Sequence, residues 1–365
     1  MIIYIIYFLL IAVFGIQYEF SPFKNNYILL VFALMLIFLA GFRDISVARD
    51  YASYQYIFNS LGYIKDTSYT GDNIAFLLAF EPGFLLIIWI FKNLFVLNYG
   101  FAIMLFYAIT SVSLKVYSIK KISVNVYISL LFYYSYFFLI HEMTQIRIGL
   151  ASGIVLVAFI YLLENKVVPF IGLVLLATCF HYSAILYLGA FFITNKKFYK
   201  PLYVGVVLAS LVLGVIKLPV LSLLGGTDLS DVSTKLNTYA ELSENGLVQI
   251  NVFNSLNLCN IFCCLYLIFA VKKEGLQKDK YLRFFLKCNI LSILLLSAFS
   301  GAPAFALRFS QLFGIAQIFL FSYLTQFLPF KKLNVFIVVL IAGVFFYVTV
   351  FYGELLKPYK IINIR

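Results

Sequence analysis

The chain has 365 residues, of which 64% are hydrophobic and 12% are charged, and its mean hydropathy is +1.00. Soluble globular proteins are about half apolar and about a quarter charged, so a water-soluble fold of this chain would expose large apolar patches. The net charge of +12 would suggest a nucleic-acid partner in a soluble protein, but no zinc spacing, basic face or stacking motif accompanies it. The composition therefore excludes a soluble enzyme, argues against nucleic acid as a partner, and predicts an integral membrane protein.

Apolar runs of roughly the 17–25 residues that a membrane helix needs follow one another along the chain. They lie near 1–18, 27–42, 99–118, 123–140, 146–163, 201–224, 250–271, 288–300, 307–328 and 333–352. Two further runs are broken by polar residues: 74–97 by Glu81-Pro82-Gly83, and 169–194 by His181-Tyr182-Ser183. No repeat or linker separates the runs. The sequence therefore predicts one all-α transmembrane domain over residues 1–365, with about eleven or twelve transmembrane or re-entrant helices.

Lysine and arginine gather between the apolar runs, where they set the orientation of a membrane protein, because cytoplasmic loops carry an excess of both. The cluster 272–287 holds six of these residues and is predicted to be cytoplasmic. The lysines at 115–121, 196–200 and 331–332 are assigned to the same side. The loop 225–250 is acidic, so it is assigned to the outer side.

The segment 169–194 must then cross the membrane twice or not at all, because the lysines at 196–200 and the end of the run 146–163 are both cytoplasmic. Two stubs of about 12 residues reach only about 18 Å each. We therefore predict a re-entrant or broken hairpin with His181 near its tip, facing the outer side. Non-helical backbone at that depth is tolerated only where it lines a cavity in the protein, so a cavity is expected at His181.

The segment 74–97 leaves two alternatives open. If it crosses the membrane once, the polar segment 43–73 is cytoplasmic. If it is a hairpin broken at Glu81, that segment lies outside. By parity, the C-terminal residues Lys357, Lys360 and Arg365 fall outside, against the charge rule.

Ionisable side chains within membrane segments are costly, and they mark functional sites more often than chance. Four groups stand out: Arg43 and Arg49-Asp50-Tyr51 with Tyr54, Glu81 before Pro82, His141-Glu142 with Gln145 and Arg147, and Arg308. Taken singly, each basic residue also fits a snorkelling helix end, and Glu81 fits an acidic helix start. For His181, a purely structural role at the hairpin tip is an equal alternative.

Arginines nevertheless converge on one side of the predicted topology. Arg147 and Arg308 share the outer face with His181, and with Arg43 and Arg49 outside, four arginines would ring one cavity. Guanidinium groups hold phosphate oxygens in a bidentate fork and stay charged when desolvated, so we expect an anionic substrate such as a lipid-attached diphosphate. P-loop, HExxH, GxSxG and CxxC motifs are absent from the sequence, which disfavours nucleotide hydrolysis, zinc proteolysis and lipase chemistry.

These residues resemble the EpsG-like branch of the Wzy-type bacterial polysaccharide polymerases. The resemblance rests on short segments whose order and spacing extend over about residues 40–310: Arg49-Asp50-Tyr51 within 43–54, Glu81-Pro82, Gln145-Ile146-Arg147 with Gly149, Phe180-His181-Tyr182-Ser183-Ala184, and Arg308. It implies a fold similar to the GT-C group of membrane glycosyltransferases.

The resemblance implies a glycosyltransferase that polymerises oligosaccharide repeat units on undecaprenyl diphosphate, at the periplasmic or outer face of the bacterial inner membrane. Its product would be O-antigen, capsule or exopolysaccharide. A lipid diphosphate is the leaving group, so no metal, nucleotide sugar or other cofactor is implied. The implied partners are the lipid-linked donor and acceptor and the bilayer lipids, joined by a chain-length regulator and a flippase, with no nucleic acid.

We assign catalytic roles to His181, Arg147, Arg308 and Asp50, and substrate-binding roles to Arg43, Arg49, Tyr54, Glu81 and Gln145. The arginines would bind the diphosphate and stabilise the charge that develops on it. His181 would take the proton of the acceptor hydroxyl near neutral pH, with Asp50 or Glu81 as the competing base. Two other functions stay open: transfer of a finished glycan by an O-antigen ligase, and transport of the lipid-linked oligosaccharide by a flippase.

Overall fold

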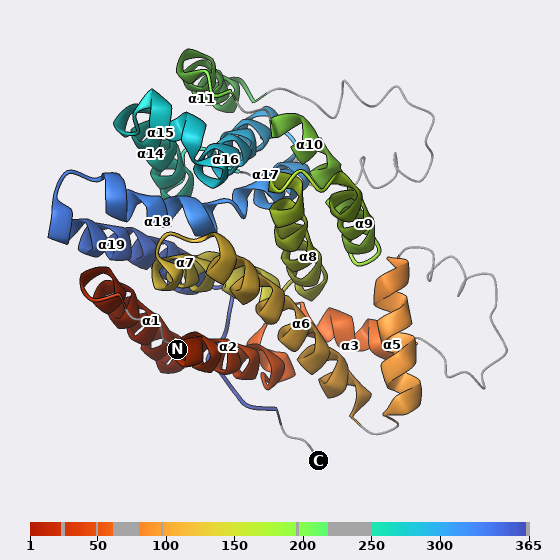
Figure 1. Cartoon of the computed structure of the whole chain (residues 1–365). Helices are drawn as coiled ribbons and strands as arrows, with labels where there is room; N and C mark the ends of the chain where they lie inside the picture. The colour runs from red at the N-terminus through yellow and green to blue at the C-terminus, as the bar shows by residue number, and fades with distance from the viewer. Residues whose placement is uncertain are drawn as a thin grey trace, which may run out of the picture. The chain divides into compact units, whose positions relative to one another are not determined.

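The computed structural model describes residues 1–22, 26–48, 50–60, 80–95, 98–194, 197–217 and 250–362. The described residues form helices and no β-strand, and their contacts divide the chain into two compact units (Figure 1). Unit 1 comprises Met1–Phe191 and Phe330–Arg365, and unit 2 comprises Phe192–Pro329. The predicted all-α, polytopic membrane fold is confirmed. A single domain over the whole chain stays a prediction, because compact units and domains need not coincide.

Unit 1 holds most of the residues singled out in the sequence. In chain order its elements are α1 (Ile2–Phe20), α2 (Asn26–Gly41), η1 (Ile45–Val47), α3 (Tyr51–Ser60), α5 (Pro82–Leu94), α6 (Tyr99–Ile122), α7 (Val126–Phe132), the π-helical η2 (Tyr133–Glu142), α8 (Ile146–Leu163), α9 (Val167–Thr178), η3 (Tyr182–Gly189), η4 (Lys331–Leu333), α19 (Asn334–Tyr347) and η5 (Val348–Tyr352). Between units 1 and 2 the chain passes through α10 (Ala190–Ile193). Helices prevail because apolar segments in lipid must satisfy their backbone groups internally.

Unit 2 contains α11 (Lys200–Ile216), α14 (Ser255–Ala270), α15 (Lys273–Lys278), α16 (Lys280–Ala298), α17 (Pro303–Gly314) and α18 (Gln317–Phe327). The predicted run 307–328 is not one straight helix, because α17 and α18 meet at a bend of 52°. The acidic loop 225–250 lies outside the described residues apart from Ile250, so its outer location stays a prediction.

Five helices among the described residues are long and apolar enough to cross a membrane, and a sixth span results if the bent pair counts as one. The five are Ile2–Phe20, Tyr99–Ile122, Ile146–Leu163, Lys280–Ala298 and Asn334–Tyr352. α8 is the most enclosed of them, with 78% of its apolar window buried against 22% for α1. A side chain carried by α8 is therefore mostly surrounded by protein, whereas most of the α1 window is not buried by the described residues.

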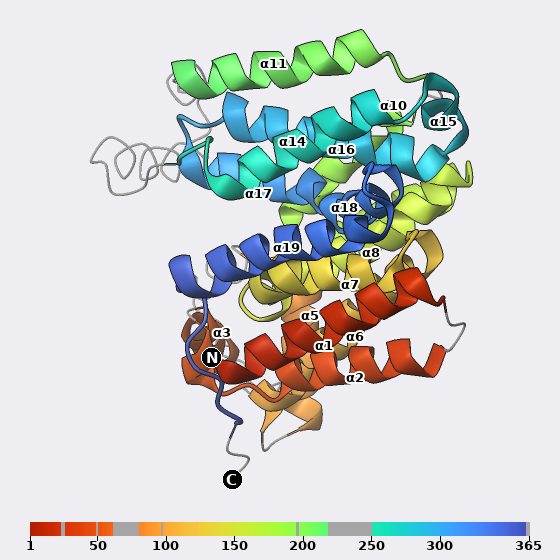
Figure 2. The same ribbon diagram turned by 90° about the vertical axis from the view of Figure 1, so that its left-hand side faces the viewer.

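The end of α2 and the start of α6 lie at the same end of unit 1, so the chain between them begins and finishes there. The ring of Phe42, just after α2, lies 5.1 Å from the ring of Phe101 in the first turn of α6. Between them, α5 runs across the direction of α1 and α2 (Figures 1 and 2). This arrangement favours the hairpin alternative for 74–97, and the side on which 43–73 lies stays a prediction. Residues 74–79 themselves lie outside the described part of the chain.

The hairpin predicted at 169–194 is present. α9 ends at Thr178 and η3 begins at Tyr182, so His181 lies at the turn between two short helical arms. The arms have 12 and 8 residues, and neither reaches the roughly 30 Å of a hydrocarbon core alone. Parity of the flanking charges thus located this break correctly.

The C-terminal segment runs beside the segment that follows α2. Antiparallel backbone bridges pair Arg43 with Ile361 and Ala48 with Leu356, and the Tyr4 hydroxyl of α1 donates to the Lys357 carbonyl at 3.3 Å. The start of α1, the segment 42–48 and the segment 356–362 therefore share one end of unit 1. We call this end the terminal face.

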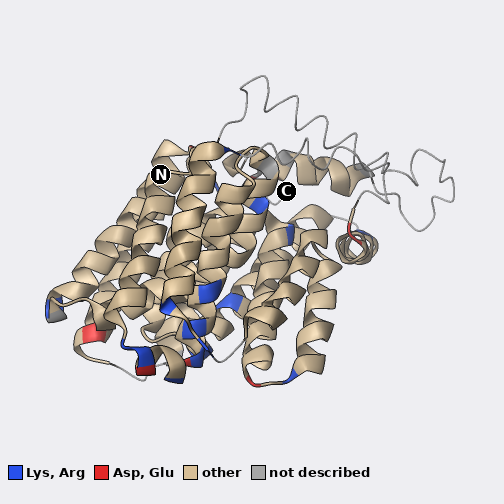
Figure 3. Cartoon of the chain, turned by 90° about the horizontal axis from the view of Figure 1, so that it is seen from above, with Lys and Arg blue, Asp and Glu red and all other residues tan. Residues whose placement is uncertain are grey.

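The opposite end of unit 1 is defined by the last turns of α1 and α6. The Asn125 amide donates to the Glu19 carboxylate there at 2.8 Å, and Lys120 and Lys121 lie in the last turn of α6. Figure 3 shows Lys and Arg gathered toward the helix ends that lie away from the two termini. Lys120 and Lys121 thus lie at the end of unit 1 opposite the terminal face, whereas Arg43, Lys357 and Lys360 lie at the terminal face itself.

Three basic residues that the sequence assigned to cytoplasmic loops are instead buried in helices. Lys115 lies within α6, where its ammonium pairs with a buried carboxylate. Arg283 and Lys287 lie in α16, which begins at Lys280 and so well before the predicted 288. The helix begins early because Asp279 caps it, accepting hydrogen bonds from the first backbone N–H groups.

Single-cysteine labelling tests the two ends of unit 1. In a cysteine-free background, Ser46→Cys and Lys357→Cys should react with a membrane-impermeant maleimide from the same side, because Lys357 N donates to Val47 O. Lys121→Cys, at the far end of α6, should react only from the other side. Intact spheroplasts and inverted vesicles supply the two sides. Reaction of all three positions from one side would contradict this fold.

Candidate functional site

Glu81 is the centre of a buried polar cluster in unit 1. It directly precedes α5, and its side chain is 5% exposed. Its Oε2 accepts a hydrogen bond from Arg147 Nη1 at 2.5 Å. Its Oε1 accepts from His181 Nδ1 at 3.2 Å and from the Tyr182 backbone N–H at 3.4 Å. Three segments that are distant in the sequence thus meet on one carboxylate.

The start of α5 is fastened to the hairpin tip by its backbone. Gly83 N–H donates to the Cys179 carbonyl at 2.7 Å, and a Cβ on Gly83 would lie only 2.7 Å from that same oxygen. Any side chain at this position would push the two segments apart. Pro82, in the first turn of α5, has the fixed φ that suits a helix start. Glu81 therefore reaches His181 because the next two residues permit a close approach.

Arg147 lies in the first turn of α8, with its guanidinium carbon 5.2 Å from the ring centre of Phe84 and 5.6 Å from that of Phe80. The Tyr54 phenol of α3 also interacts with it. The Arg147 and His181 side chains are 25% and 20% exposed. Both can therefore meet a ligand, whereas the Glu81 carboxylate behind them cannot.

The cluster determines which nitrogen of the His181 imidazole carries the proton. Burial alone would raise the pKa of Glu81, but the His181 hydrogen bond and the Arg147 charge outweigh it and hold that pKa below its ordinary value. Glu81 is therefore an ionised acceptor at neutral pH, and the His181 Nδ1–H points to it. The neutral imidazole then carries its lone pair on Nε2, the atom that can accept a proton. Because both Glu81 oxygens are occupied, the geometry favours His181 over Glu81 as a base.

Two further predicted residues lie close to this cluster, and a third adjoins it along the chain. Tyr54 is in electrostatic range of Arg147, and Asp50, one helical turn earlier, is in range of Tyr54. Gln145 immediately precedes α8, two residues before Arg147. The structure thus groups Asp50 and Tyr54 with the Glu81 cluster through α3.

Arg43 lies in an enclosed position at the terminal face, within electrostatic range of Tyr54. Its side chain donates to the Ala40 carbonyl, lies 5.5 Å from the ring centre of Tyr51, and is 1% exposed. Burial lowers the pKa of Arg43 to about 10, so it stays a cation at neutral pH. Its Nε and Nη2 have no hydrogen-bond partner within the described ranges. The guanidinium is therefore held by protein and not directed toward solvent.

The other two predicted arginines are not placed at the Glu81 cluster. Arg308 lies in α17 of unit 2 with an exposed side chain, and Arg49 lies outside the described residues. The predicted ring of four arginines stays a prediction. Within the described part of the chain, Arg147 is the one arginine that pairs with Glu81.

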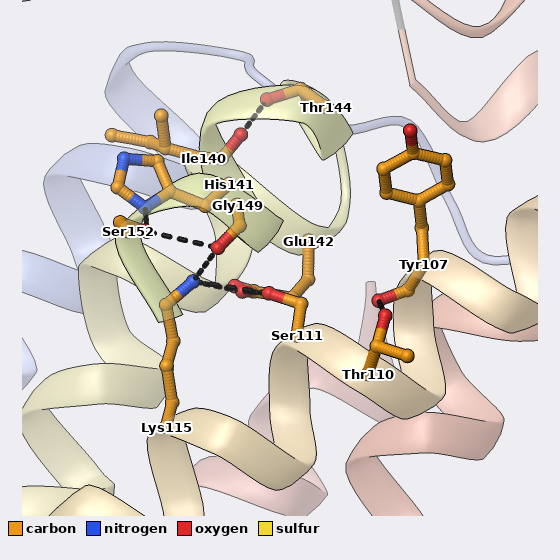
Figure 4. Close-up of polar contacts among 10 residues, drawn as sticks. All are labelled: Tyr107, Thr110, Ser111, Lys115, Ile140, His141, Glu142, Thr144, Gly149 and Ser152. Carbon is orange, nitrogen blue, oxygen red and sulfur yellow. Dashed lines mark hydrogen bonds and ion pairs between the residues drawn. The ribbon is translucent and has the colours of Figure 1, made fainter. Parts of the chain in front are cut away.

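The structure contains a second buried ion pair that the sequence did not predict. Lys115 of α6 pairs with Glu142 at the end of η2, and Ser111 donates to the same carboxylate oxygen at 2.6 Å (Figure 4). His141 Nδ1 lies 3.4 Å from the Ser152 hydroxyl beside them. The sequence analysis selected His141 and Glu142 as candidate site residues but assigned Lys115 to a cytoplasmic loop. The available signal was the spacing of Ser111 and Lys115, which puts two polar side chains on one face of an apolar helix.

Comparison with known proteins agrees with the extent of this fold. The family profile described as the EpsG family matches residues 26–361. The amylovoran biosynthesis protein AmsC of Erwinia amylovora is 26% identical over 312 residues, covering 82% of this chain and 79% of AmsC. No solved structure matches the chain. The region matched by the family profile includes Glu81, Arg147 and His181 together with both elements of the second ion pair.

Glu81→Gln should destabilise unit 1 by at most about 3 kcal/mol, because Arg147 loses its buried partner. The pKa of Glu81 is lowered from 4.5, so its stabilising contribution is fully present above about pH 5 and is lost as the pH falls through the lowered pKa. Melting temperatures of wild type and variant in detergent should therefore converge as the pH falls below about 5. A difference that persists undiminished after Glu81 is protonated would contradict the ion pair.

Proposed function

The chain belongs to the EpsG family, and on this basis we propose that it polymerises oligosaccharide repeat units carried on undecaprenyl diphosphate. The amylovoran biosynthesis protein AmsC, which is similar over most of its length, supports a role in the synthesis of a bacterial polysaccharide. The proposed chemistry is glycosyl transfer from one lipid-linked glycan to the sugar of the next. O-antigen, capsule and exopolysaccharide all fit this description.

The observation that carries the proposal is the pairing of an oriented histidine with an arginine at one buried carboxylate. His181 Nε2 takes the proton of the acceptor hydroxyl, and the hydroxyl oxygen forms a bond to the anomeric carbon of the donor glycan. The bond from that carbon to the diphosphate breaks, and its electron pair leaves with the lipid diphosphate. Glu81 stabilises the imidazolium that forms, as a carboxylate does beside a catalytic histidine.

Arg147 has N–H donors beyond the one that Glu81 accepts, since a guanidinium carries five. We assign these donors to the diphosphate, where they would stabilise the charge that builds up as the bond breaks. We propose that Asp50 and Tyr54 border the substrate site on the side of α3. Arg49, Gln145 and Arg308 keep their proposed roles in substrate binding or catalysis, to be tested one by one. The side chain of Arg43 is enclosed in this structure, so its substrate-binding role stays a prediction.

The proposed orientation follows from the charges at the two ends of unit 1. Lys120, Lys121 and Lys166 lie at the ends of α6 and α8 that are away from the terminal face. We give more weight to these lysines of helix-connecting loops than to Lys357 and Lys360 of the C-terminal segment, which lie at the terminal face against the charge rule, and so propose that the terminal face is directed outward. We propose that the reaction occurs at the periplasmic or outer face of the inner membrane, with a GT-C-like arrangement around it. A flippase would deliver the repeat units, and a chain-length regulator would act on the product.

Purified protein in detergent should extend lipid-linked repeat units without a membrane potential. His181→Ala should lower the turnover by about 10²–10⁴-fold through loss of the base, and Arg147→Ala by about 10²–10³-fold through loss of charge stabilisation. Lys166→Ala, a change at a 55% exposed side chain, is the matched control and should keep wild-type turnover. Normal turnover and expression in both site variants would refute this site.

The length of the surface glycan separates polymerase from ligase. Deletion of the gene should leave single repeat units on the cell surface, because ligation continues without polymerisation. A complete loss of surface glycan would indicate a ligase. Turnover by the detergent-purified protein, in which no gradient exists, separates either enzyme from a transporter.

A further inference from the structure

The buried pair of Lys115 and Glu142 is not used by the chemistry described above. Both side chains are 0% exposed, so neither can touch a substrate. The Lys115 ammonium contacts three acceptors: the Glu142 carboxylate, the Ser111 hydroxyl at 3.3 Å and the Gly149 carbonyl at 2.9 Å (Figure 4). An ammonium has three donors, so all of its hydrogen-bonding capacity serves the protein itself.

The acceptors of Lys115 lie at the two ends of one short segment. Glu142 is the last residue of η2, and Gly149 lies in the first turn of α8. The segment 142–149 is therefore tied to α6 at both ends by a single side chain. Figure 4 shows the ammonium between these two attachment points.

The packing around Gly149 leaves this segment little freedom to shift. A Cβ on Gly149 would lie 3.2 Å from the His141 carbonyl oxygen, closer than an ordinary contact. The Ser152 hydroxyl donates to the same Gly149 carbonyl that Lys115 binds, at 2.9 Å. The start of α8 is thus packed closely against the end of η2. Lys115 of α6 binds its Gly149 carbonyl from outside the helix, whereas the Ser152 bond lies within α8.

Arg147 lies inside the tied segment, two residues before Gly149. Its Nη1 reaches Glu81, and Glu81 in turn holds His181 Nδ1. A shift of the segment 142–149 would therefore move the guanidinium away from the carboxylate and release the imidazole. Misplacement of a reacting group by about 1 Å is enough to lower a rate about 10²-fold.

We propose that Lys115 and Glu142 are positioning residues, which hold the segment 142–149 so that Arg147 keeps its contact with Glu81 and Glu81 keeps the orientation of His181. The kinetic consequence of this role rests on the proposed function. The geometry at Arg147 is a separate consequence that is measurable without any reaction.

The test uses a double variant in full-length protein. Lys115→Met alone leaves Glu142 buried without a cation, so it should fold poorly. Lys115→Met with Glu142→Met removes both charges, and replacement of a buried pair by apolar residues is often neutral for stability. The double variant should melt close to wild type but lose at least about tenfold in kcat, with KM within about twofold. Lys287→Met, which removes a lysine 3% exposed in unit 2, is the control and should keep wild-type kcat.

The second readout is the chemical reactivity of Arg147 toward phenylglyoxal, followed by peptide mass spectrometry. The guanidinium paired with Glu81 should react slowly in the wild type and faster in the double variant. A double variant with wild-type stability and wild-type kcat, or with unchanged Arg147 reactivity, would overturn the positioning role. Absence of turnover in the wild type would overturn the proposed function alone, because the reactivity of Arg147 still decides the positioning role.

Ser111→Ala replaces the double variant if the latter fails to fold. This change leaves both charges in place and removes one hydroxyl that bonds to both of them. It should lower kcat by about threefold and raise the reactivity of Arg147. In that case the proposal would be overturned if Ser111→Ala left kcat or the reactivity of Arg147 unchanged.

Discussion

The Glu81 carboxylate accepts hydrogen bonds from Arg147 and His181, which lie 66 and 100 residues further along the chain. An ionised carboxylate removed from water costs several kcal/mol unless donors and a cation replace its hydration. The start of α5, the start of α8 and the turn between α9 and η3 must therefore converge on this group. The contact of Gly83 with Cys179 shows how closely the backbones approach to allow it.

A second buried ion pair in unit 1 imposes a constraint of the same kind. Lys115 and Glu142 are fully buried, and within a membrane protein such charges have to find their partners inside the protein. Their pairing joins α6 to the junction of η2 and α8. The junction 142–147 thus links the two ion pairs, since Glu142 belongs to one and Arg147 to the other.

The electrostatics of the cluster suit the proposed reaction through orientation more than through net charge. Glu81 and Arg147 largely cancel each other, and the histidine proton is directed by the carboxylate. What remains available to a ligand is the partly exposed edge of Arg147 and the second nitrogen of His181. Arg43, which the sequence grouped with these residues, is enclosed beside Tyr51 at the terminal face and within electrostatic range of Tyr54.

The sequence alone predicted those features that depend on residues close together along the chain. Apolar run length, loop charge and parity identified a polytopic helical membrane protein and located a broken hairpin at His181, because these quantities are counted along the chain. The same reasoning selected Glu81, Arg147 and His181 as individual residues. Only the tertiary structure decided that they meet on one carboxylate, since this depends on α5 lying across the long helices. It likewise paired Lys115 with Glu142, 27 residues away. From the sequence alone, a lysine beside an apolar run is assigned to a loop, because its buried partner is known only once the helices are packed.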